Sequence, residues 1–165
     1  MALDMFIKLG DSIKGSSQDK AHKSQCDVLA YSWGMSQSGN FHAGSGGGAG
    51  KVNIQDLSFT KYLDDATTAI MMHCCTGKHI PVVTLTVRKA GGELGKPGEN
   101  EIIITMTKVM ITSVSTGGSG GESKFTENVT LNFAEVKFEN FKQDEHGVTT
   151  TAGNLNWNIA ENAGK

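Results

Sequence analysis

The chain has 165 residues, a length typical of one domain with a sizeable buried core. Its 15 basic and 17 acidic residues are well mixed and give a net charge of -2, so we expect no basic face for nucleic acid or for an acidic membrane surface. No stretch approaches the roughly 18 apolar residues of a membrane span, and the N-terminus lacks the basic start and apolar core of a signal peptide.

Alternating side chains predict two strands in the first part of the chain. Met5, Ile7 and Leu9 share one face of the first strand, and the polar residues 10 to 24 predict a loop after it. The stretch CDVLAYSWGMSQS, from residue 26, predicts a second strand. Its two expected faces are a bulky core face (Leu29, Tyr31, Trp33, Met35) and a small outer face (Val28, Ala30, Ser32, Gly34). A smooth outer face favours close approach by another surface or a narrow channel, and a glycine-containing edge strand is the alternative.

Residues 36 to 51 predict a long glycine- and serine-rich loop with Phe41 and His42 near its tip. Its stretch GSGGGAGKV invites comparison with the phosphate loop G-x-x-x-x-G-K-[ST]. Ser45 stands where the first glycine belongs and Val52 where the hydroxyl belongs, so we expect no nucleotide site. A loop of this length needs an anchor, which favours contact with a partner subunit.

The middle of the chain predicts a strand over residues 52 to 60, with a phase slip near Asp56, and then one helix. We expect Asp64 or Asp65 to cap this helix, and Gly77 to end it in a left-handed conformation after ATTAIMMHCC. A stripe at helical spacing is expected to lie on the sheet: Ala66, Ala69, Ile70, His73 and Cys74.

The second half of the chain predicts strands joined by turns. Residues 82 to 92 and 101 to 115 are expected to form a hairpin, followed by a glycine-rich connector over residues 115 to 123. The strand ENVTLNFAEVKFENF changes phase after Phe133, residues 142 to 153 are expected to be polar and mobile, and a last strand passes through Leu155, Trp157 and Ile159. These patterns predict a mainly β domain of about eight strands and one helix.

Residues able to do chemistry form no recognisable catalytic, cofactor or metal site. The best histidine and cysteine cluster, His73-Cys74-Cys75 with His79, is more simply explained as a helix end. Ser45 and Ser119 lie among glycines, but neither has the strand-to-helix setting of a G-x-S-x-G elbow, and adjacent Asp64 and Asp65 are expected to serve the helix start. An odd count of three cysteines favours a reducing, cytosolic place of synthesis. By elimination, the sequence favours a structural or binding protein.

Five stretches in chain order resemble the haemolysin-coregulated protein (Hcp) family, which forms the tube of the bacterial type VI secretion system. They are MALDMFIKLGD, DVLAYSWGMSQSG, GGGAGKVNIQDLSFTKYLDDAT, GKHIPVVTLTVRKAGG and TSVSTGGSGGESKFTENVTLNFAEV, and they cover most of residues 1 to 139. The resemblance implies a single domain over residues 1–165, a two-sheet β-barrel with one flanking helix. It further implies that six copies close into a ring and that rings stack head to tail.

The same resemblance implies which residues contact partners. It places Ser32 toward the ring's channel, with Ala30 and Gly34 on the same face, as contacts for small effector proteins. It assigns ring stacking or subunit contact to the two glycine loops, at Phe41, His42, Gly46, Gly47, Gly48, Gly50, Gly118 and Gly120. The implied partners are other copies of the chain, a tip spike protein, contractile sheath proteins and effectors.

The resemblance also implies a protein made in the cytoplasm and then secreted through the type VI system without a signal peptide. It implies no enzyme activity and no cofactor. Two alternatives come from other classes: a monomeric small-molecule binder that uses a β-barrel interior, and a hydrolase whose site is assembled across strands.

Overall fold

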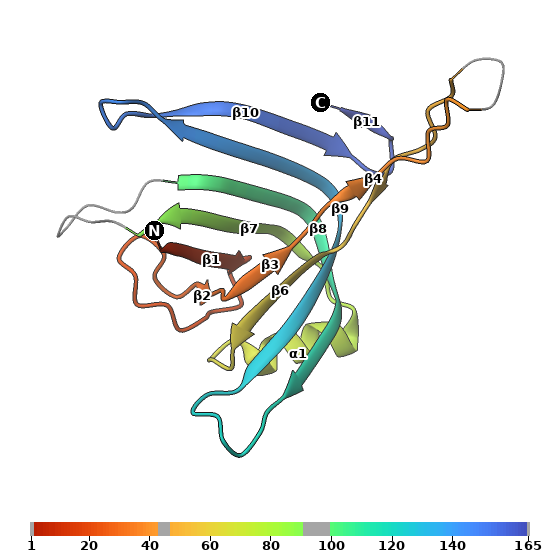
Figure 1. Cartoon of the computed structure of the whole chain (residues 1–165). Coiled ribbons are helices and arrows are strands. Elements are labelled where there is room, and N and C mark those ends of the chain that lie inside the picture. Colours follow the sequence, from red (N-terminus) through yellow and green to blue (C-terminus); the bar gives the residue numbers. More distant parts are fainter. Residues whose placement is uncertain (1, 43–46, 91–99, 165) are drawn as a thin grey trace.

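The computed structural model describes residues 2–42, 47–90 and 100–164, and shows one bent antiparallel sheet with a single helix against it (Figure 1). One continuous path of the sheet has the order β11-β10-β9-β8-β7-β1-β2. Its strands are β1 (Leu3–Leu9), β2 (Cys26–Asp27), β7 (Ile80–Lys89), β8 (Asn100–Gly117), β9 (Thr126–Gln143), β10 (Thr149–Asn158) and β11 (Ala163–Gly164). The mainly β fold with one helix is therefore confirmed for the described residues.

Two long strands, β8 and β9, run through both halves of the sheet, and each has 18 residues. In the upper half, β9 pairs with β10 over residues 135–143. In the lower half it pairs with β6 (Leu57–Tyr62) over residues 126–131, and β6 pairs in turn with β3 (Ala30–Ser32). The lower half is thus a four-stranded ladder with the order β3-β6-β9-β8.

The buried face of both long strands changes phase at the same level. In β8 the buried side chains step from Met106 to Val109 around Lys108, which has a φ of 55°. In β9 they step from Phe133 to Val136. The phase change predicted after Phe133 therefore marks a bend within a continuous strand.

The predicted closed barrel is wrong. Residues 26–32 cross from one edge of the sheet to the other, because β2 pairs with β1 while β3 pairs with β6. At the crossing, the Val28 N–H donates to the Met5 carbonyl at 2.9 Å and the Leu29 N–H donates to the Thr60 carbonyl at 2.8 Å. Because β2 and β3 belong to different ladders and do not pair with each other, the sheet stays open.

The crossing also overturns the two faces predicted for residues 28–35. The single strand expected there is three short ones, β2, β3 and β4 (Met35–Ser36). Val28 is buried at 6% exposure, whereas Leu29 and Met35 are 41% and 44% exposed. Because the chain changes partner strand after residue 27, the alternation of buried and exposed side chains does not continue through the crossing. The predicted core face is therefore confirmed only for Tyr31 and Trp33, which pack partly against the core.

Helix α1 (Thr67–Thr76) lies against β8 and ends at Gly77, whose φ of 66° confirms the left-handed stop. Its N-cap residue is Ala66, which carries no capping side chain, so neither aspartate is the cap residue. The Asp64 carboxylate still accepts a hydrogen bond from the Ala66 N–H at 2.9 Å, just before the first helical residue. The predicted stripe is confirmed at Ala66 and Ile70, which are fully buried.

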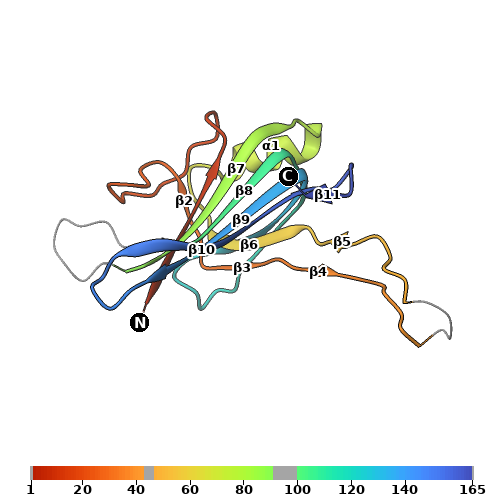
Figure 2. The same cartoon turned by 90° about the horizontal axis from the view of Figure 1, so that it is seen from above.

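A hairpin arm leaves the body of the protein beside β3 and β6 (Figures 1 and 2). We call residues 35–42 and 47–54 the arm. It is held at its base by β4 and β5 (Asn53–Ile54), and further out by a bridge between Asn40 and Gly48. The expected loop is thus an extended β-hairpin over the residues that the structure describes.

Residues 142–153 form a β-hairpin that joins the end of β9 to the start of β10, and not the mobile connection that was predicted. β9 continues to Gln143, and β10 begins at Thr149. The turn between them is held by the Asp144 carboxylate, which accepts hydrogen bonds from the His146 and Val148 N–H groups.

Candidate interaction surfaces

The lower ladder presents a face of small, uncharged side chains. Its register aligns Ser32, Ser58, Thr130 and Ser113 in one row, and Ala30, Thr60, Asn128 and Ser115 in the next. Because side chains of paired residues lie on the same side of a sheet, these eight residues share one face, which we call the neutral face. All eight are exposed or half-buried, and none carries a charge.

The polar groups of the neutral face partly satisfy one another. The Ser58 and Thr130 hydroxyls are 3.2 Å apart, and the Thr60 hydroxyl donates to the Asn128 side-chain oxygen at 2.6 Å. A β-bulge between Ile111 and Ser113 brings Ser113 opposite Thr130 and so completes the row. The result is a smooth surface with hydroxyl groups to offer and no long side chain.

The structure brings Ser32 and Ala30 together on the neutral face, as the small-face pattern predicts for them. Gly34 lies beyond the end of β3, and its carbonyl accepts a hydrogen bond from the Gln55 N–H at 2.9 Å. The other six members of the face were not singled out from the sequence. Their proximity depends on pairing between residues far apart in the chain, such as Ser58 and Thr130, which are 72 positions apart, and local patterns do not encode it.

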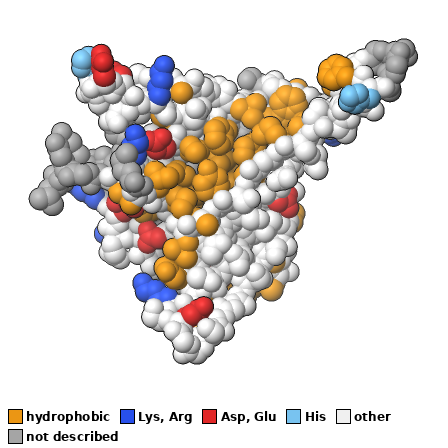
Figure 3. Space-filling model, viewed as in Figure 1, with side chains coloured by type: hydrophobic (Ala, Val, Ile, Leu, Met, Phe, Trp, Pro, Cys, Tyr) orange, Lys and Arg blue, Asp and Glu red, His pale blue; other side chains and the backbone are white. Residues whose placement is uncertain are grey.

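A band of hydrophobic side chains remains open along the upper side of the β3–β4 ribbon (Figure 3). We call it the apolar strip, and we assign to it five hydrophobic side chains that pack against the core but are only partly buried, namely Met5, Trp33, Ile102, Phe138 and Trp157. Trp33 stacks on Phe138 with 5.9 Å between ring centroids. Within the described chain, the buried indole N–H of Trp33 has no hydrogen-bond partner.

The arm carries one exposed aromatic ring. Phe41 is 90% exposed, and its ring lies over Gly47, where an added Cβ would come within 2.3 Å of it. Gly50 makes similar room for the Ser38 hydroxyl, whereas nothing lies within 4 Å of a Cβ at Gly48. His42 is exposed, and its N–H donates to the Asn40 side chain at 2.7 Å. Gly46 lies outside the described residues.

A second exposed hydrophobic group, which no sequence pattern predicted, lies at the far end of β6. Tyr62, Leu63 and Phe125 are 40%, 43% and 50% exposed, and we call them the end patch. The Leu63 N–H donates to the Phe125 carbonyl at 3.1 Å, which holds the two segments together. The Phe125 ring lies over Gly118, where a Cβ would come within 2.0 Å of it, while Gly120 meets nothing within 4 Å.

Charged side chains are buried beneath the end patch, on the opposite face of the ladder. Lys61 and Glu127 are paired in register and fully buried, and the Lys61 ammonium forms ion pairs with Glu127 and, at 2.7 Å, with Asp64. Burial lowers the pKa of Lys61, but its hydrogen bonds to the two carboxylates outweigh this and raise the pKa above its ordinary value of 10.5. Burial, with the nearby Asp64 charge, raises the pKa of Cys26 to about 12.

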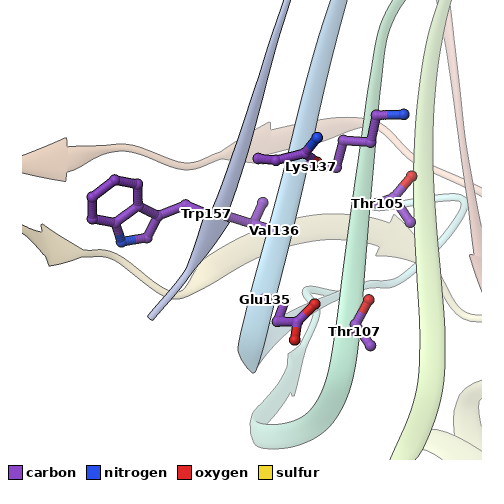
Figure 4. A pocket seen from close by; sticks show the side chains of 7 residues that line it. Thr105, Thr107, Glu135, Val136, Lys137 and Trp157 are labelled. Carbon is purple, nitrogen blue, oxygen red and sulfur yellow. The ribbon is translucent and has the colours of Figure 1, made fainter. Parts of the chain in front are cut away.

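The remaining surface features favour neither a metal site nor catalysis. No three His, Cys, Asp or Glu side chains of the described residues are placed to hold a metal ion. A shallow depression of about 180 Å³ brings Thr105 and Thr107 of β8 beside Glu135 and Lys137 of β9 (Figure 4). These charges have partners elsewhere: Glu135 accepts from the Asn158 amide, and Lys137 lies 3.5 Å from Glu139.

The sequence predicts no membrane-spanning segment, and the length of the helix can be compared with that prediction. In the part of the chain that the structure describes, α1 is 10 residues long, and no helix has the length and apolar character needed to cross a bilayer.

Comparison with known proteins assigns the family. The family model described as "Type VI secretion system effector, Hcp" matches residues 6–139. This chain belongs to the Hcp family. Protein hcp1 of Pseudomonas aeruginosa is 56% identical over 166 residues, which cover 98% of each chain. The resemblance stated from the sequence is therefore confirmed.

Solved structures of Hcp proteins share the fold. Hcp1 from Salmonella typhimurium is 34% identical, with a TM-score of 0.78 and complete coverage of both chains. A structure described as a type six secretion system protein reaches a TM-score of 0.90 at 28% identity, covering 99% of this chain and 100% of its own. The Hcp match at residues 6–139 includes the arm, the neutral face and the end patch, whereas β10 and β11 follow it.

Proposed function

We propose that this Hcp chain is the repeating subunit of the type VI secretion tube. Copies join side by side into a ring of six, rings stack head to tail, and small effector proteins are carried and stabilised in the channel. The observation that carries the proposal is the neutral face on a ladder whose two outer edges are both open.

The open edges support a lateral, head-to-tail contact. In the lower ladder, β3 pairs only with β6, and β8 beyond Val109 pairs only with β9, so no described strand covers the opposite edge of either. Unpaired N–H and C=O groups on an edge are a template for another strand. Two different edges of one ladder make a heterologous contact, which closes into a ring when the rotation between copies allows it.

The apolar strip supports the same arrangement. Exposed hydrophobic surface of this kind usually marks a protein interface. The strip lies along the β3–β4 ribbon (Figure 3), so a neighbour that approaches the β3 edge would reach it. Such a contact would remove Trp33 and Phe138 from water, a larger gain than strand pairing alone provides.

In a ring built this way, the neutral face lines the channel. Short hydroxyl and methyl side chains leave the passage open and offer hydrogen bonds to a folded cargo without a fixed charge pattern. Ser32 occupies the first row of this face, next to the open β3 edge. We therefore assign effector contact to Ser32 and Ala30, and to Gly34 just beyond the end of β3.

Assembly can be tested by size-exclusion chromatography with light scattering. Six copies of 17.5 kDa give a particle of about 105 kDa, and annular particles are expected in negative stain. A particle near 17.5 kDa at every concentration tried would overturn the ring and leave a monomeric binder as the better explanation.

Cargo contact can be tested by Ser32→Gln, which adds bulk to the neutral face. We expect normal rings and a reduced level of co-expressed effector. The matched control is Thr150→Gln on exposed β10, which leaves the neutral face untouched. Equal effector levels in the two variants would count against the assignment of Ser32.

Stacking is assigned to the arm and to the connector between β8 and β9. Gly48→Glu places a charge at a position where an added Cβ meets no atom within 4 Å, so we expect a folded subunit and intact rings. We expect shorter tubes, because the arm then brings a charged group to the contact; unchanged tube length by electron microscopy would argue against this role. The contractile sheath, the tip spike protein and export from the cytoplasm without a signal peptide are proposed from the family assignment.

A further inference from the structure

The arm and the end patch lie at opposite ends of the same pair of strands. β3 leads into the arm through β4, and β5 leads from the arm into β6. The chain then follows β6 away from the arm to Tyr62 and Leu63 at its far end. Figure 1 shows the arm continuing the direction of β3 and β6, with the lower end of the ladder on the opposite side of the molecule.

From this geometry we infer that Phe41 of one copy docks on the end patch of a second copy in the adjoining ring. The inference rests on the proposed function and adds the surface that receives the arm. Lateral neighbours meet the sides of the ladder, through the edges of β3 and β8. A projection that continues the strand direction leaves the ring along the channel axis, so its partner is the copy above or below.

The reach of the arm supports an axial contact. Six residues separate Met35 from Phe41, which corresponds to about 20 Å of extended strand. This is about the length of β6 itself, which has six residues. Phe41 is 90% exposed and touches Gly47 of its own arm, so its ring gains little burial within its own chain.

The chemistry of the two surfaces also matches. The end patch offers one aliphatic and two aromatic side chains, a suitable surface for a phenyl ring. Exposed Asp65 and Glu122 lie in the segments that flank it, along with Lys124, whose ammonium is 5.1 Å from the centre of the Tyr62 ring. Lys51 is the charged side chain of the arm, so weak charge complementarity accompanies the apolar contact.

The test exchanges the apolar contact for an ion pair. Phe41→Glu and Leu63→Lys each place one charge in the contact, and the double variant places opposite charges there. We expect each single variant to form normal rings and to need at least about tenfold more protein to stack, because burying one phenyl ring is worth that factor or more. The double variant is expected to recover most of the loss. Met72→Glu on α1, at 62% exposure in the wild type, is the matched control and is expected to stack normally.

Ring formation is measured by light scattering and stacking by sedimentation and negative-stain length distributions. The inference is overturned if the single variants stack like the wild type, if the double variant shows no recovery, or if rings of the wild type never stack at the highest attainable concentration. Loss of rings in Phe41→Glu would also overturn it, since the arm would then contact a lateral neighbour. Absence of rings in the wild type is a different result, because it removes the proposed function itself.

A glycine pair gives a second test of the receiving surface. Gly118→Ala must displace the Phe125 ring, because the new Cβ would come within 2.0 Å of it, whereas Gly120→Ala meets nothing within 4 Å. We expect weaker stacking for Gly118→Ala and unchanged stacking for Gly120→Ala, with normal rings in both. Equal stacking in the two variants would contradict a role for Phe125.

Discussion

Replacing Lys61 by Met should lower the free energy of unfolding much more than most single substitutions do. The side chain of Lys61 is fully buried and neutralises Glu127, which is also fully buried, and Asp64, whose side chain is 11% exposed. Methionine keeps most of the volume but removes the positive charge, so two carboxylates are left without their cation. One Glu127 oxygen already has no hydrogen-bond partner among the described residues.

The expected loss is large because one partner of a buried ion pair is removed. Breaking such a pair typically lowers the free energy of unfolding by about 3–5 kcal/mol. At roughly 2–4 °C per kcal/mol for a chain of this size, the melting temperature should fall by roughly 6–20 °C. Urea unfolding followed by circular dichroism, at one fixed protein concentration because assembly adds stability, gives the free energy directly.

Lys8→Met is the matched control for this measurement. Lys8 lies 3.5 Å from Asp11 on the surface, and the two side chains are 52% and 97% exposed. An exposed pair of this kind contributes well under about 1 kcal/mol. If Lys61→Met loses no more stability than Lys8→Met, the buried cluster does not hold the end of β6 to β9 and to the start of α1, and our account of it is wrong.

Three further predictions follow from thiol burial, a helix terminus and two linked ionisable groups. Ellman's reagent at pH 8 should modify exposed Cys75 in the native protein and Cys26 only after unfolding, since Cys26 is buried with a pKa of about 12. Gly77→Ala should lower the free energy of unfolding by about 1–2 kcal/mol in denaturant titrations, because the φ of 66° strains an L-residue. The third prediction concerns Asp19, which is paired with Arg88. Burial raises the pKa of Asp19, but the hydrogen bonds from Arg88 and from backbone N–H groups outweigh it and lower the pKa below 3.8. The ionised Asp19 carboxylate therefore stabilises the folded protein above pH 3.8, and this stabilisation is lost as the pH falls through the lowered pKa. Acid unfolding curves of the Asp19→Asn variant should lack this pH-dependent stabilisation.

The alternation of hydrophobic residues was enough to predict the strands of the second half and the helix before Gly77. It failed between residues 26 and 35, where Val28 is buried and Leu29 is exposed. Period-2 reasoning assumes one partner sheet, and here the chain changes partner within two residues, from β1 to β6. The barrel was implied by the family resemblance and not by alternation, and the described strands leave the sheet open because β2 and β3 do not pair with each other.

The candidate interaction surfaces were predictable only in part. Ser32 and Ala30 have a small-residue pattern within one strand, which the sequence shows. Their alignment with Ser58 and Thr60 depends on the register between β3 and β6, and the bulge in β8 then sets which of its residues join the row. The end patch joins residues 62–63 to residue 125 through a long-range backbone hydrogen bond, for which the sequence has no local signal.

The unbroken course of β8 and β9 through both halves has a mechanical consequence. Each strand keeps hydrogen bonds to the other from residues 102–117 against 126–140, across the bend. A load applied along the lower ladder is therefore passed to the upper sheet through two continuous backbones. If copies assemble into stacked rings as proposed above, these two strands would carry an axial load through each subunit.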